Sequence, residues 1–272
     1  MHLCFMTFSV PEYTLSQVLT TAIRYGYDGV EPRTVAGHKH GIELELTKAQ
    51  RAEVKSAFSD CGVRMSCLAT SLTYAAFEEA VVDARVEETK RYLQLASDVG
   101  SPNLRVFGGG WPEGMEEEQA ISTVAGALAR CAAAADNCNV NLCLETHDGF
   151  CEARKVGAVI AQANHPRVGA NWDFAHSVRV GESIEESYAY LKGHVYHTHI
   201  HDITWPEDNI HELSFAPMGT GMVPHLEPIK LLAAEPAEIA LSLEWESGEN
   251  SDEVLPREAG VLREYMAEAR GA

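Results

Sequence analysis

Hydrophobic and polar residues form two patterns that alternate along the whole chain. Short apolar runs typical of buried strands alternate with longer runs whose apolar positions recur every three or four residues, as in amphipathic helices. The short runs predict eight strands, at Leu3–Ser9, Asp28–Arg33, Val63–Ala69, Asn103–Gly108, Val140–His147, Val168–Asp173, Val195–Asp202 and Ile239–Glu246. The longer runs predict eight helices, at Leu15–Tyr25, Thr47–Cys61, Phe77–Val99, Glu116–Cys138, Glu152–Asn164, Ser183–Lys192, His225–Ala234 and Glu253–Ala269.

Residues at several predicted helix ends support these boundaries. Thr14 and Ser183 are of the type that caps a helix N-terminus, because their hydroxyl oxygens accept hydrogen bonds from the first free backbone N–H groups. Gly26, Gly62 and Gly100 are suited to end a helix, because glycine adopts the left-handed conformation without steric cost. Strand and helix therefore alternate in eight units, and we expect right-handed crossovers between them.

Eight strand–helix units in 272 residues predict an α/β protein with a (β/α)₈ TIM barrel fold, as a single domain over residues 1–272. The alternative is an open doubly wound sheet, which would be expected to carry a glycine-rich phosphate loop after its first strand. The turn there reads SVPEYT and matches neither GxGxxG nor GxxxxGK[ST]. No low-complexity linker or block of charge divides the chain, which favours one domain.

Acidic and histidine side chains fall on one face of the last four predicted strands. Because side chains alternate along a strand, the apolar set should face the helices and the other set the barrel interior. This parity turns the following residues inward: Asn141, Cys143, Glu145, His147, Asn171, Asp173, His197, His199, His201, Ser242, Glu244 and Glu246. Several of them lie near the carboxyl ends of their strands, where barrel enzymes build their active sites.

Several carboxylates buried together require a compensating positive charge. None of the seven lysines falls within a predicted strand, which also argues against a Schiff-base aldolase. We therefore predict one divalent metal ion, and the donor set, rich in oxygen, is suited to Mn²⁺, Mg²⁺ or Co²⁺. The predicted ligands are Glu145, Asp173, His199 and Glu244. The alternative is a hydrated polar rim in which these groups pair with Arg105 or Arg33.

Charge and cysteine content restrict the class of protein. The formal net charge is −19, from 40 acidic and 21 basic residues, and such a field repels polyanions. We therefore expect a small-molecule substrate, with neither nucleic acid nor a membrane as partner; a homo-oligomer is compatible with the composition. The N-terminus lacks a basic region followed by a cleavage site. Seven cysteines without a CxxC pair are typical of reduced thiols in a cytoplasmic protein.

Seven motifs add a family resemblance to this picture. In chain order they read GYDGVEPR, NLRVFGG, LCLETH, NWDFAH, YHTHIHD, APMGTG and LSLEWE. They resemble GxxGVExR, RxFxG, LxxExH, DxxH, hHxKD, PxGxG and hSxExE of the sugar phosphate isomerase/epimerase family, the xylose isomerase-like TIM barrels. The likeness runs nearly end to end. Each motif alone is weakly specific, and their shared order and spacing carry the resemblance.

The resemblance implies roles for individual residues. It implies metal ligands at the same four positions that strand parity selects. It also implies that Glu145 and Glu244 act as the acid/base pair, as their counterparts do in the epimerases of the family.

Substrate contacts are also implied. Glu31, Arg105 and His176 stand where the family usually contacts its substrate, and His147 is a further candidate for hydroxyl binding or proton transfer. His201 stands where the family commonly has a lysine, and we count it among the candidate substrate contacts. The segment ITWPEDN lacks the arginine that ketose 3-epimerases place after this strand, which argues against that particular activity.

The implied function is a metal-dependent isomerase or epimerase of a sugar or keto-polyol, acting through proton abstraction beside a carbonyl and an enediolate stabilised by the cation. A lyase or dehydratase, resembling inosose or dehydroshikimate dehydratases, would use the same residues and is the alternative. Two other classes remain. A DNA-repair endonuclease would need a basic groove, which the net charge opposes, and a non-catalytic sugar-binding barrel would have no activity to lose.

Overall fold

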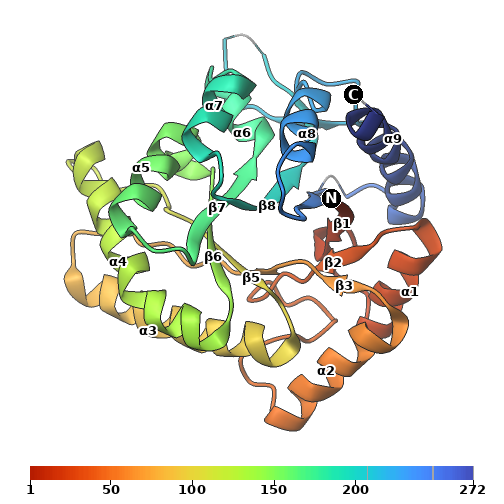
Figure 1. Cartoon of the computed structure of the whole chain (residues 1–272), viewed down its shortest axis with the longest axis horizontal. Helices are drawn as coiled ribbons and strands as arrows, with labels where there is room; N and C mark the ends of the chain where they lie inside the picture. Colours follow the sequence, from red (N-terminus) through yellow and green to blue (C-terminus); the bar gives the residue numbers. More distant parts are fainter. Residues whose placement is uncertain (207, 247, 272) are drawn as a thin grey trace.

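Parallel strands form the centre of the molecule, and helices surround them (Figure 1). The structure is a computed structural model that describes residues 1–206, 208–246 and 248–271. The central strands are β1 (His2–Met6), β2 (Gly29–Glu31), β3 (Arg64–Met65), β4 (Leu68–Ala69), β5 (Asn103–Val106), β6 (Asn141–Glu145), β7 (Val168–Asp173), β8 (Val195–Ile200) and β11 (Ala240–Leu243).

The order of these strands confirms the barrel. It runs β3-β2-β1-β11-β8-β7-β6-β5-β4, and each neighbouring pair is parallel. β3 and β4 are the two halves of the predicted strand Val63–Ala69, so the sheet begins and ends on one segment. A further parallel bridge joins Arg33, just beyond β2, to Ala69 of β4. The open doubly wound sheet, considered as the alternative, is therefore wrong.

The eight predicted helices are present, each within two residues of its predicted ends. They are α1 (Leu15–Tyr25), α2 (Lys48–Cys61), α3 (Glu79–Val99), α4 (Glu117–Cys138), α5 (Ala153–Ala163), α7 (Ile184–Leu191), α8 (Leu226–Ala233) and α9 (Ser251–Gly271). Thr14 and Ser183 each form the predicted N-cap as part of a capping box. Gly26, Gly62 and Gly100 end their helices in the left-handed conformation.

The strands β6 and β7 alternate in the way that parity predicts. The Trp172 ring on β7 stacks against Tyr188 of α7, with ring centroids 6.0 Å apart, and is fully buried. Its neighbour Asp173 therefore points away from the helices and into the barrel.

Several predicted strands were too long, and several short elements were not predicted, among them the 3₁₀ helices η1 (Thr7–Ser9) and η2 (Asp148–Phe150). The predicted strand Val63–Ala69 is interrupted between β3 and β4, and Val195–Asp202 ends at Ile200. The chain then forms a hairpin of β9 (Asp202–Thr204) and β10 (Ser214–Ala216). The short helix α6 (Phe174–Arg179) begins directly after β7.

Two aspartate side chains hold the segments that follow β7 and β8. The Asp173 carboxylate accepts a hydrogen bond from the backbone N–H of His176 (3.1 Å), which starts α6 at the end of β7. The Asp202 carboxylate accepts hydrogen bonds from the backbone N–H groups of Gly219 (2.9 Å) and Gly221 (2.8 Å). These two bonds draw the loop after β10 back against β9.

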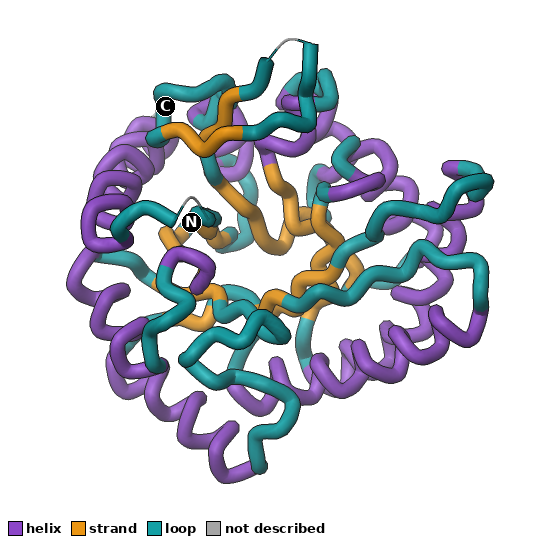
Figure 2. The backbone as a smooth tube through the Cα atoms, turned by 180° about the vertical axis from the view of Figure 1, so that it is seen from behind, coloured by secondary structure: helices purple, strands orange, loops and turns teal. Residues whose placement is uncertain are grey.

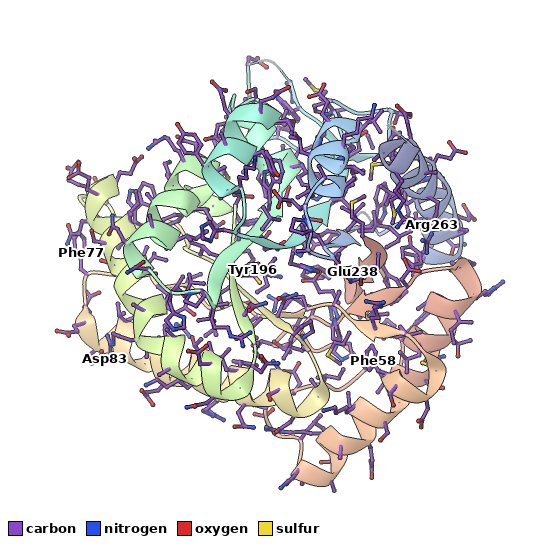
Figure 3. The ribbon with its side chains drawn as sticks, viewed as in Figure 1. Phe58, Phe77, Asp83, Tyr196, Glu238 and Arg263 are labelled. Atoms are coloured by element: carbon purple, nitrogen blue, oxygen red, sulfur yellow. The ribbon has the colours of Figure 1, made fainter. Side chains whose placement is uncertain are left out.

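The two ends of the barrel differ in their loops. Tyr196, near the start of β8, and Glu238, just before β11, lie near the centre of Figure 3. The opposite view shows long loops that cross in front of the strands (Figure 2). In the described part of the chain, no helix combines the length and apolar character needed to cross a membrane.

One acidic contact joins the first strands to the last helix and yields a test of the fold. Asp28 accepts hydrogen bonds from the Leu3 backbone N–H (2.7 Å) and from Arg263 (2.9 Å), whose side chain belongs to α9 (Figure 3). Burial raises the pKa of Asp28, but the hydrogen bonds from Arg263 and Leu3 outweigh burial and lower it below its usual 3.8. The folded state therefore favours the ionised form.

Replacing Asp28 with Asn should make stability less sensitive to acid. Because the folded pKa is depressed, the contact contributes stability above the unfolded pKa and loses it as the pH falls through the folded value. Denaturant titrations between about pH 7 and about pH 3 should give a wild-type advantage that shrinks toward acid. A constant advantage would contradict this account, and Asp60→Asn on the exposed face of α2 is the control.

Candidate metal centre

Four side chains converge where strands on one side of the barrel end. Glu145 and Asp173 are the last residues of β6 and β7, His199 is next to last in β8, and Glu244 directly follows β11. One potential ligand atom from each lies within 4.8 Å of the other three. Donors on opposite sides of an ion at about 2.1 Å are about 4.2 Å apart, so this spacing is near that of one coordination sphere.

The cluster is withdrawn from solvent. The side chains of Glu145, Asp173 and His199 are at most 1% exposed, and that of Glu244 is 15% exposed. The hydrated rim considered as an alternative therefore does not describe them. Among the described residues, Arg105 is the basic side chain that forms an ion pair with one of these carboxylates. Its Nε lies 3.2 Å from Glu145 Oε2. Arg33 instead hydrogen-bonds Ser71 and a backbone carbonyl.

The ring of His199 is held in one orientation. Its Nε2 lies 3.0 Å from Glu31 Oε1, so this nitrogen donates a hydrogen bond to Glu31. Its Nδ1 lies 3.2 Å from Glu145 Oε1 and 3.1 Å from Glu244 Oε2. In the neutral ring the Nδ1 lone pair would face two carboxylates, a repulsion that only a proton or a cation relieves.

Electrostatics within the cluster favour charged groups. Burial alone would lower the pKa of His199, but the carboxylates of Glu145, Glu31 and Glu244 raise it well above its usual value. Burial raises the pKa of Glu145 and of Glu244, and in both cases His199 outweighs burial and lowers the pKa. Both glutamates are therefore ionised at neutral pH, as a base that accepts a proton from substrate must be.

The residues present fit a divalent cation. Asp173 Oδ2, His199 Nδ1 and His201 Nδ1 are buried and have no hydrogen-bond partner among the described residues. Buried polar atoms are normally paired, so three such atoms aimed at one cluster indicate a missing positive partner. Three carboxylates and an imidazole are a donor set that binds divalent metals.

Glu31 lies on the other side of the His199 ring from Glu145 and Glu244. Its carboxylate also accepts hydrogen bonds from His197 Nε2 (2.8 Å) and from Ser242 Oγ (2.6 Å), and it is fully buried. The predicted contact of Glu31 with substrate stays a prediction. Three hydrogen bonds already occupy its oxygens, and this arrangement favours a role in holding His199.

The other predicted substrate contacts lie around the cluster. The rings of His147 and His176 meet edge to face, with centroids 4.5 Å apart, and His176 meets His201 at 5.7 Å. These three histidines form one wall of the site, and the side chain of His147 is 34% exposed. Arg105 stacks on the Phe107 ring at 4.0 Å beside Glu145. The structure thus brings four of the five together near the ligand atoms.

Sequence reasoning gave no role to three residues that support the cluster. Asn171 donates a hydrogen bond to Glu145 Oε2 (3.3 Å), and His197 and Ser242 hydrogen-bond Glu31. Strand parity had turned all three inward. Their partners lie on other strands, however, and a single strand pattern contains no information about those partners.

Comparisons with known proteins agree with this fold. The chain resembles the crystal structure of the IOLI protein with a bound zinc atom (TM-score 0.81, 17% identity, 99% of this chain and 98% of that one). It also resembles the probable 3-DHS dehydratase AsbF of Bacillus anthracis (TM-score 0.79, 18% identity, covering 97% and 99%). A third similar structure is that of L-ribulose 3-epimerase (TM-score 0.80, 16% identity, 99% of this chain and 95% of that one).

These identities are low and establish the fold alone. No curated protein matches the sequence. The family model described as the xylose isomerase-like TIM barrel matches residues 19–265, which is most of the chain. The motifs, the closed barrel and this match agree, and the chain belongs to the xylose isomerase-like TIM barrel family.

Proposed function

We propose that this chain is a metal-dependent isomerase or epimerase that moves a proton beside the carbonyl of a sugar or keto-polyol. The observation that carries the proposal is the convergence of Glu145, Asp173, His199 and Glu244 at the carboxyl ends of their strands. Two of the three carboxylates are buried, and one arginine pairs with them. The similarity in fold to an epimerase and to a zinc-bound protein supports it.

The four converging residues would hold one divalent cation, and we propose Mn²⁺, Mg²⁺ or Co²⁺ from the excess of oxygen donors. When bound, the cation would polarise the substrate carbonyl and stabilise the negative charge that develops on its oxygen.

Glu145 and Glu244 are the proposed acid/base pair. They come from β6 and β11, which are separated in the barrel by β7 and β8, and they approach His199 Nδ1 from two sides. A substrate carbon between them would meet one carboxylate on each face. One ionised glutamate would remove the proton beside the carbonyl, and the other, after it takes up a proton from solvent, would donate that proton to the opposite face, which gives epimerisation. Return of the proton to the neighbouring carbon gives isomerisation.

Neighbouring side chains would tune and orient this pair. Arg105 and Asn171 both contact Glu145 Oε2, so that oxygen is held in place while Oε1 faces His199. His147 and His176 offer imidazole nitrogens for the hydroxyl groups of a substrate. Glu31 would act as a positioning residue, because its hydrogen bond directs His199 Nδ1 toward the carboxylates.

A lyase is the second candidate, and two observations favour it. The fold similarity includes a probable dehydratase. In addition, His147 Nδ1 lies 3.0 Å from Asp148 Oδ1. Burial would lower the pKa of His147, but the interaction with Asp148 outweighs burial, and the pKa is raised. A protonated His147 would be suited to donate a proton to a departing hydroxyl group.

Isotope exchange separates these two reactions. In D₂O with Mn²⁺ and a panel of ketoses and inososes, an isomerase or epimerase should place deuterium on a carbon beside the carbonyl without elimination. A lyase should give an unsaturated product, detectable by its ultraviolet absorbance. The absence of both reactions over the whole panel would contradict the proposed chemistry.

Glu145→Gln and Glu244→Gln should each lower kcat by about 10²–10⁴-fold, because each removes a base that contacts the reacting carbon. Steady-state kinetics at saturating substrate and metal measure the loss. Glu246→Gln removes an exposed carboxylate near the same mouth and is the charge-matched control. Equal activities in all three variants would rule out the acid/base assignment.

Metal binding should be visible as stabilisation of the fold. A cation at one hundred times its Kd should add about 2.7 kcal/mol to the free energy of unfolding, and a chelator should remove this gain. Asp173→Asn should abolish the metal-dependent rise in Tm while it keeps the N-cap of α6, because asparagine also caps helices well. Asp136→Asn on α4 is the control. The account fails if metal raises the Tm of Asp173→Asn as much as that of the wild type.

Glu31→Gln should weaken metal binding by about 10–100-fold, since the charge that orients His199 and increases its basicity is lost. Titration calorimetry with Mn²⁺ measures the effect, and Glu246→Gln controls for a general change in charge. An unchanged Kd in Glu31→Gln, beside a folded far-UV spectrum, would remove Glu31 from the metal centre.

A further inference from the structure

His201 presents an unpaired nitrogen to the same carboxylates. It follows β8 directly, and its side chain is 5% exposed. Its Nδ1 lies 3.6 Å from Asp173 Oδ2 and 3.9 Å from Glu244 Oε2, distances too long for hydrogen bonds. Among the described residues, His201 Nδ1 has no hydrogen-bond partner, and neither has Asp173 Oδ2. The two unpaired atoms therefore face each other across a short gap.

Packing holds the His201 ring in this orientation. The rings of His176 and Phe215 lie on it, with centroids 5.7 Å and 5.5 Å away. Phe215 belongs to β10, so the hairpin that follows β8 covers the imidazole. Its position is therefore fixed by side chains from two other segments.

Hydrogen bonds sort the nearby histidines by which nitrogen carries the proton. His199 donates through Nε2 to Glu31, so in the neutral ring the lone pair lies on Nδ1. His176 accepts a hydrogen bond on Nδ1 from Arg179 Nε (3.0 Å), so its proton lies on Nε2. No described residue donates to His201 Nδ1, and that nitrogen is free to carry a lone pair.

The position of the proton on His176 bears on whether this region would bind one metal ion or two. Asp173, His176 and His201 also form a group whose ligand atoms lie within 4.8 Å of one another, which would suit a separate ion. The nitrogen that His176 turns toward Asp173 is Nε2, however, and it carries the proton. A protonated nitrogen cannot bind a metal. Such a second site would retain only two donors, Asp173 and His201, which argues against a separate ion there.

We propose that His201 is a fifth protein ligand of the metal centre, which then has two imidazoles and three carboxylates. The inference rests on the metal site proposed above. Donors bound to one ion at about 2.1 Å lie about 3.0–4.2 Å apart, and the distances from His201 Nδ1 to Asp173 and Glu244 fall in this range. This role replaces the contact with substrate that the sequence predicted for His201.

A fifth ligand changes what the centre can bind. A second imidazole shifts the preference from Mg²⁺ toward Co²⁺ or Zn²⁺, because nitrogen donors favour these metals.

The number of bound imidazoles can be counted directly. The full-length protein, loaded with one equivalent of Mn²⁺, would be studied by electron spin echo envelope modulation, which detects coordinated histidine nitrogens. We expect two nitrogen couplings in the wild type, one in His201→Gln and two in His176→Gln. Titration calorimetry should also show that His201→Gln loses more affinity for Zn²⁺ than for Mg²⁺.

The other outcomes are distinct. One nitrogen coupling in the wild type would overturn the proposal and leave the four-ligand site in place. Two metal ions per chain by elemental analysis, with one lost in His176→Gln, would overturn it in favour of a separate second site. Absence of metal binding would overturn the proposed metal-dependent function together with this inference. The number of nitrogen couplings in the wild-type protein tests the proposal even if a variant fails to fold.

Discussion

The repulsion among three carboxylates at one end of the barrel, two of them buried and the third 15% exposed, is the constraint on which the site depends. Strand alternation directs Glu145, Asp173 and Glu244 to one point, and Arg105 offsets only part of their charge. Desolvated charges of one sign are costly unless a cation is added. The barrel tolerates this arrangement because its strands and helices are stabilised elsewhere, by apolar residues such as Trp172. On the same strands, apolar side chains that face the helices stabilise the fold, and acidic side chains that face the barrel interior favour a bound cation.

Polar residues behind the ligand atoms fix the orientation of the His199 ring. Glu31 accepts hydrogen bonds from His197, His199 and Ser242, all of which are fully buried. Because Glu31 accepts a hydrogen bond from His199 Nε2, the opposite nitrogen of the ring faces the carboxylates. The orientation of one metal-facing imidazole on β8 is therefore set by a residue of β2, from which β1 and β11 separate it. Hydrogen bonds from such outer residues are a general way to tune a metal ligand.

Local patterns predicted most of the fold, and contacts between distant segments explain the rest. Alternation along β6 and β7 was enough to turn Glu145 and Asp173 inward, and capping residues determined the helix ends. At the break between β3 and β4, Ser66 instead bonds to distant segments: its N–H donates to the Val30 carbonyl and its carbonyl accepts from the Asn103 side chain. Which nitrogen of a histidine carries its proton likewise depends on partners far away in the chain, so no motif contained that information.

An anomalous difference map from crystals soaked in Mn²⁺ tests the central claim most directly. The account predicts one strong peak per chain, within bonding distance of Glu145, Asp173, His199 and Glu244. A barrel mouth with no peak at full metal loading, or a peak bound elsewhere while these four side chains pair only with protein groups, would contradict it.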